Sequence, residues 1–223
     1  MKKKIITILV CAAVMLTTAC DKSGISSTST SSSSSESSNE SKTEGGFAHG
    51  KQDENTYISE FLGLKVEFDD GWTMQTDEVL AQTNFISDMS DENAQKALNK
   101  NAVLYEMVAA AETASNVNIV IENLNITNGG KPLTAEEYIN MVIGNLESQF
   151  KETLVAVDVE TEKSAADFLG SEAACINIKV TTGEQVLYQK MIPLSRGAYM
   201  GVISFSGASG EEISSAMSMF KSL

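Results

Sequence analysis

Residues 186–206, VLYQKMIPLSRGAYMGVISFS, decide the fold class of this chain of 223 residues. Two apolar-rich runs, 186–194 and 198–206, flank Ser195-Arg196-Gly197, which is typical of a hairpin turn. Strands joined by so short a connection pair antiparallel, because a parallel pair needs a long crossover. The stretch therefore predicts antiparallel pairing at this point of a sheet.

Further strands are predicted along the chain. Residues 64–68 alternate apolar and charged side chains, the pattern of a half-buried strand. Residues 117–121 and 174–180 also carry an apolar residue at every second position. Residues 102–110 predict another strand, although their alanines leave a helix open. Residues 154–163 are a weaker candidate, because acidic side chains interrupt them.

Two capping boxes predict helices in the second half of the chain. Thr134 is followed three residues later by Glu137, and Ser209 is followed in the same way by Glu212. Each pair precedes apolar residues at helical spacing, so each marks the start of an amphipathic helix.

Two shorter helices are expected earlier, at 77–83 and at 91–100, the second capped by Ser90. The predicted order is a strand, short helices, two strands, a long helix, several strands and a closing helix. Runs of strands with separated helices indicate an α+β fold, with a mainly antiparallel sheet flanked by helices.

Tyr57, the run Leu62-Gly63-Leu64-Lys65-Val66-Glu67-Phe68 and then Gly71-Trp72 resemble the opening of the PsbP/Mog1-like group of small extracytoplasmic domains. Those domains have a Pro-x-Gly-Trp turn, and here Asp69-Asp70 stand where the proline is expected. The resemblance implies an α/β/α sandwich. It implies no functional residues, because members of the group do unrelated jobs as binding or accessory modules.

The first residues of the chain predict export and lipidation. Lys2-Lys3-Lys4 precede an apolar stretch, 5–16, which is too short to span a bilayer. It ends in Leu16-Thr17-Thr18-Ala19-Cys20, which resembles the lipobox of bacterial lipoproteins, with Thr17 where leucine is usual. We therefore expect residues 1–19 to be a removed signal peptide and Cys20 to carry a diacylglyceryl group, whose two acyl chains suffice for anchoring. Ordinary secretion with a free Cys20 thiol is the alternative.

Residues 20–54 predict a disordered tether, because they are rich in serine and nearly free of apolar side chains. As a flexible coil this segment would reach about 30–35 Å. Residues 55–223 are long enough for a single domain with one core. The arrangement fits the outer face of a Gram-positive cell membrane, whereas in a Gram-negative cell Asp21 would favour retention at the inner membrane.

The formal net charge of the chain is −14, which argues against nucleic acid and against direct adhesion to anionic lipid headgroups. His49 is the only histidine and is placed in the tether, so histidine-based catalysis and histidine metal ligands are not expected in the folded part. Cys175 is the only cysteine left in the domain and lies within a predicted strand, where a small buried side chain is the ordinary use.

Three other features are weighed against their structural interpretations. We expect the Trp72 side chain to fill part of the core, and the alternative is that it stacks against a bound sugar. Residues 88–93 are acidic but lack the spaced oxygens and glycine of a calcium loop. The glycine-rich residues 206–210 precede a helix but lack a phosphate-binding motif, so they are interpreted as a loop and cap.

The sequence thus favours a non-enzymatic binding or accessory module, held at a membrane by its lipid, for another envelope protein or a small-molecule ligand. We expect no metal, cofactor or nucleic acid, and the oligomeric state is left open. The alternative is a carboxylate-dependent hydrolase acting on glycans, which would need a cleft with two facing acids and an exposed aromatic such as Trp72.

Overall fold

The computed structural model describes residues 46–113, 115–153 and 158–223. The predicted signal peptide, Cys20 and the predicted tether up to residue 45 lie outside the described residues. Within the described ranges, no helix is long and apolar enough to cross a membrane.

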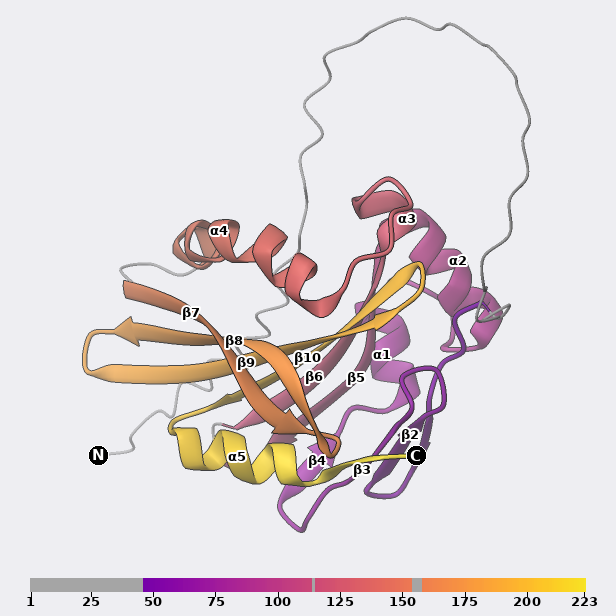
Figure 1. Cartoon of the computed structure of the whole chain (residues 1–223). Helices are drawn as coiled ribbons and strands as arrows, with labels where there is room; N and C mark the ends of the chain where they lie inside the picture. Colours follow the sequence, from indigo (N-terminus) through magenta and orange to yellow (C-terminus); the bar gives the residue numbers. More distant parts are fainter. Residues whose placement is uncertain (1–45, 114, 154–157) are drawn as a thin grey trace, which may run out of the picture.

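The described residues form an α+β fold with antiparallel sheets and flanking helices, which confirms the predicted fold class (Figure 1). One sheet has seven strands in the order β4-β5-β6-β10-β9-β8-β7, and the other has four in the order β1-β2-β3-β11. The strands are β1 (Lys51–Asp53), β2 (Thr56–Ser59), β3 (Leu64–Glu67), β4 (Trp72–Met74), β5 (Val103–Ala111), β6 (Asn116–Asn123), β7 (Asp158–Phe168), β8 (Ser171–Thr182), β9 (Gln185–Arg196), β10 (Tyr199–Gly207) and β11 (Phe220–Ser222). The helices are α1 (Asp77–Thr83), α2 (Asp91–Asn101), α3 (Leu124–Thr127), α4 (Ala135–Thr153) and α5 (Gly210–Ser218).

The seven-stranded sheet has a separate hydrophobic core on each face, because successive side chains of a strand point to opposite sides. In β6, Ile119 and Ile121 belong to the core shared with α5 and the four-stranded sheet. In β10, Met200 and Val202 belong to the second core, beneath α4. Figure 1 shows α4 and α5 on opposite sides of the sheet. The sheet is therefore the middle layer of the molecule.

The predicted hairpin is present, with a tighter turn than the sequence indicated. Arg196 of β9 pairs with Tyr199 of β10, so only Gly197 and Ala198 lie between the strands. Gly197 has φ = 61°, and a glycine at the first central position is the usual choice in a type II′ turn. Ser195 and Arg196, predicted as turn residues, belong instead to β9.

Both predicted capping boxes start a helix, but only the first is complete. The Thr134 N–H donates to the Glu137 carboxylate at 2.8 Å, and the Glu137 N–H donates to the Thr134 hydroxyl at 3.2 Å. At α5 the Glu212 N–H donates to Ser209 at 3.2 Å, but the Glu212 carboxylate accepts from the Ser115 hydroxyl at 2.6 Å instead. Glu212 thus ties α5 to the start of β6.

The predicted cap of α2 needs correction. α2 begins after Ser90 as expected, but the Ser90 side chain makes no capping hydrogen bond. Its backbone N–H donates instead to the Asp88 carboxylate at 3.0 Å, which closes the turn before the helix. The weak strand prediction at 154–163 corresponds to β7, which begins at Asp158, and residues 154–157 lie outside the described residues.

The folded part begins earlier than Asn55, where the sequence placed it. Phe47 is only 3% exposed, and its ring contacts Phe61 edge-on with ring centroids 5.2 Å apart. β1 follows and pairs with β2. The sequence did not reveal this segment because one aromatic among glycines and polar residues leaves no hydrophobic period to detect.

Candidate functional site

A cavity of about 590 Å³ lies between the seven-stranded sheet and the helices. Its floor comes from β5, β6 and β10, α4 covers it on one side, and α2 with the segment after α1 borders it on another. Its size is within the range of small-molecule binding sites. The cavity is therefore the candidate binding site of the chain.

The floor of the cavity has an apolar middle and polar ends. Asn118 of β6 lies opposite Ser204 of β10, and the next pair on the same face is Val120 opposite Val202. Glu122 follows two residues further along β6, about 13 Å from Asn118 at the ordinary rise of a strand. An elongated molecule lying along β6 would meet polar groups at both ends.

Glu122 places a carboxyl group at one end of the floor, and it is only 2% exposed. The Tyr138 hydroxyl, from α4, donates to its Oε2 at 2.7 Å, while its Oε1 has no hydrogen-bond partner. Burial, and then the nearby Glu122 carboxyl, raise the pKa of Tyr138 well above its ordinary value, so this hydroxyl stays a donor. One carboxyl oxygen of this cavity-lining residue is thus buried without a hydrogen-bond donor.

The other end of the floor also carries unused hydrogen-bonding groups. Asn118 and Ser204 are 5% and 3% exposed, and within the described part of the chain neither side chain has a hydrogen-bond partner. Buried amides and hydroxyls are normally paired, because an unpaired polar group in a protein interior costs about 1–3 kcal/mol. Both side chains line the cavity, so a ligand or water there can pair with them.

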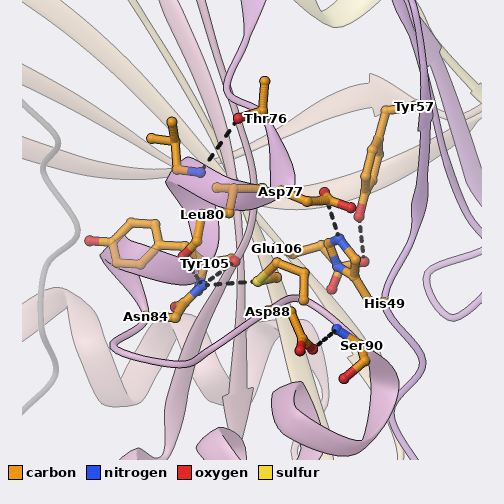
Figure 2. A network of polar contacts seen from close by, with 12 residues as sticks. His49, Tyr57, Thr76, Asp77, Leu80, Asn84, Asp88, Ser90, Tyr105 and Glu106 are labelled. Atoms are coloured by element: carbon orange, nitrogen blue, oxygen red, sulfur yellow. Dashed lines mark hydrogen bonds and ion pairs between the residues drawn. The ribbon is translucent and has the colours of Figure 1, made fainter.

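The mouth of the cavity carries an aromatic side chain in an unusual conformation. Phe85 is 90% exposed and has φ = 57°, which only a few per cent of non-glycine residues adopt. The preceding residue, Asn84, fixes this turn to β5: its Nδ2 donates to the Tyr105 carbonyl at 2.8 Å, and its Oδ1 accepts from the Tyr105 N–H at 2.8 Å. Figure 2 shows this pair of residues. Phe85 is thus presented at the rim on a fixed turn.

A second polar cluster, shown in Figure 2, joins the first residues of the fold to β5. Tyr57 and Ser59 of β2 both donate to Oε1 of the fully buried Glu106, at 2.8 and 3.1 Å. Glu106 lies where the register between β5 and β6 shifts, so it is the extra residue of a bulge. Burial raises its pKa from 4.5 to about 7, and the hydrogen bonds from Tyr57 and Ser59 limit the rise.

His49 belongs to this cluster, which corrects its placement in the tether. Its side chain is 6% exposed, and its Nε2 lies 3.3 Å from Asp77 of α1. Gly50 follows directly, and a Cβ there would meet the Tyr57 hydroxyl at 2.2 Å, so only glycine lets the two segments approach. Because Tyr57 and Glu106 are buried, the cluster fastens the N-terminal segment and does not face the cavity.

The other residues singled out from the sequence have structural surroundings. Cys175 is fully buried in the first core. Trp72 is half-buried and stacks on Phe68 with ring centroids 5.2 Å apart. Asp88 accepts hydrogen bonds from the Ser90 backbone and, at 2.8 Å, from Asn93, which accounts for the acidic 88–93 segment. No group of three potential metal-ligating side chains occurs within the described ranges.

The sequence did not point to Asn118, Glu122 or Ser204. Their strands show a clear apolar face, which predicts that the polar face meets water. In the structure that second face is covered as well, by α4. A polar residue on a strand becomes a candidate site residue only when the structure shows that both faces of its sheet are covered, because its side chain is then buried.

Comparison with known proteins adds no assignment: no family model matches the chain, and no curated protein matches it in a sequence search.

Proposed function

We propose that this chain is an extracytoplasmic lipoprotein, anchored through Cys20, that binds a small amphipathic molecule in the cavity between the seven-stranded sheet and α4. The observation that carries the binding role is the floor of the cavity, where valines lie between two sets of unpaired polar groups. The lipid anchor rests on the resemblance of residues 16–20 to a lipobox.

The cavity supports binding more than glycan hydrolysis. Glycoside hydrolysis ordinarily uses two carboxyl groups on either side of the bond that is cleaved. Glu122 is the only carboxylate among the described residues that line this cavity. The other fully buried acid, Glu106, faces the four-stranded sheet and is bonded to Tyr57 and Ser59. Trp72 does not line the cavity either.

Binding can be tested with residues 21–223, which keep every described contact and lack the lipidated cysteine. An environment-sensitive apolar dye should bind at one site per chain. Val120→Trp should abolish binding, because Val120 is half-buried at the centre of the floor and the indole would fill the cavity. Val79→Trp, at a position on α1 that is 41% exposed, is the matched control and should bind as the wild type does. Equal dye binding by both variants would refute the cavity as the site.

The anchor is tested separately in cells. A radioactive fatty acid should label the full chain, and Cys20→Ala should remove the label. A labelled Cys20→Ala protein, or an unlabelled wild type, would contradict the lipoprotein assignment while leaving the cavity unaffected.

A further inference from the structure

We infer that the ligand of this cavity is an elongated apolar molecule with a single protonated amine at one end, and that the amine lies against Glu122. This inference rests on the proposed binding function and adds the chemical class of the ligand. It is drawn from which groups on the cavity wall are already paired and which are not.

The end of the cavity at Glu122 needs a hydrogen-bond donor. The Tyr138 hydroxyl already occupies Oε2, and Oε1 is buried with no partner. A carboxyl group left half-paired in a buried place is costly, and a hydrogen bond to a charged group contributes about 1.5–3 kcal/mol. An alkylammonium group supplies both the donor and the opposite charge, whereas a ligand carboxylate would supply neither and would be repelled.

The middle of the cavity needs an apolar chain. Val120 and Val202 form the floor there, and Val142 and Leu146 face them from α4. Aliphatic side chains on both sides offer no hydrogen bonds, so polar groups in the middle of a ligand would be desolvated without compensation. The distance of about 13 Å between Glu122 and Asn118 sets the length of this apolar part.

Lysines on α2 limit the ligand to one positive charge. Lys96 and Lys100 also line the cavity. Lys96 is paired with Glu92 on the surface at 2.5 Å, while Lys100 has no ion pair within the described ranges. Glu122 is the only carboxylate among the described residues that line the cavity, so it can balance one ammonium group, and a second would add to the positive charge of Lys96 and Lys100. The far end therefore suits a neutral group that can pair with Asn118 and Ser204.

The test compares three probes with the same chain length and different ends: octylamine, octanol and octanoate. The affinity of each probe for residues 21–223 is measured at neutral pH by its displacement of the apolar dye. We expect octylamine to bind about tenfold or more tightly than octanol, as a charge-assisted hydrogen bond would give, and octanoate to bind least well. In Glu122→Gln the preference for the amine should disappear while octanol affinity stays within about twofold. Glu112→Gln removes the same charge from an exposed position and should keep the preference.

The wild-type protein offers a second readout that does not depend on how Glu122→Gln folds. Nuclear Overhauser contacts should link the nitrogen-bearing methylene of octylamine to the ring protons of Tyr138. The methyl end of octylamine should show contacts to Val120 and Val202 in the middle of the floor. Tighter binding of octanoate, an amine preference that survives Glu122→Gln, or a reversed orientation would overturn the inference. If none of the three probes displaces the dye, or the dye itself does not bind, the proposed function fails as well.

Discussion

At the scale of single residues, Glu106 gives the fold a defined pH dependence. Its pKa is raised from 4.5 to about 7 by burial. Below about pH 4.5 the side chain is protonated in the folded and the unfolded chain alike. As the pH rises toward 7, the unfolded chain loses this proton while the folded chain keeps it, so folding becomes less favourable. The stability that Glu106 contributes, about 3 kcal/mol, is thus present below pH 4.5 and lost above pH 7.

Glu106→Gln should remove this dependence, because glutamine mimics the protonated acid at every pH. Urea unfolding of residues 21–223 between pH 4.5 and 8 should show the variant gaining about 3 kcal/mol relative to the wild type as the pH rises. The comparison is made against Glu112→Gln, which removes a carboxyl from an exposed position. If the free energy of unfolding of Glu106→Gln changes with pH in parallel with that of the wild type and of Glu112→Gln, the buried carboxyl does not titrate in this range.

At the scale of elements, two of the three N-caps predicted from the sequence, Thr134 and Ser90, should differ in their contribution to stability. Thr134 makes both hydrogen bonds of its capping box at the start of α4, whereas the Ser90 side chain makes none at the start of α2. Thr134→Ala should therefore lower the free energy of unfolding by about 1 kcal/mol. Ser90→Ala, the matched control, should stay within about 0.5 kcal/mol of the wild type. Urea unfolding at constant pH measures both, and equal losses would contradict the assignment of the caps.

The elements themselves were predictable from the sequence because their signals are local. Alternation located β3, β6 and β8, and the capping boxes located α4 and α5 within a few residues. The bulge at Glu106 and the use of both faces of β6 were not predictable, because each depends on a segment distant in the sequence. Glu106 needs β2 as its partner, and Glu122 becomes buried only beneath Tyr138.

At the scale of the whole molecule, the fold depends on its first residues. A chain that starts at Asn55, the boundary indicated by composition, lacks Phe47, His49 and β1. Burial of the Phe47 ring alone suggests a loss of about 3 kcal/mol or more. The midpoint of urea unfolding should lie at a markedly lower urea concentration for residues 55–223 than for residues 46–223. Residues 21–223 should match residues 46–223, since the removed part has almost no apolar side chains to bury. Equal midpoints for all three would contradict the corrected boundary.

The attachment of this N-terminal segment also determines how mechanical load would enter the molecule. The Phe47 and His49 N–H groups donate to Gln95 and Asp91 of α2, each at 2.8 Å, before the chain reaches β1. A force applied to the chain before Phe47 would therefore strain α2 first, and only later separate β1 from β2. Since α2 forms one edge of the cavity, tension carried through the proposed anchor at Cys20 would act on the cavity before it acts on the sheets.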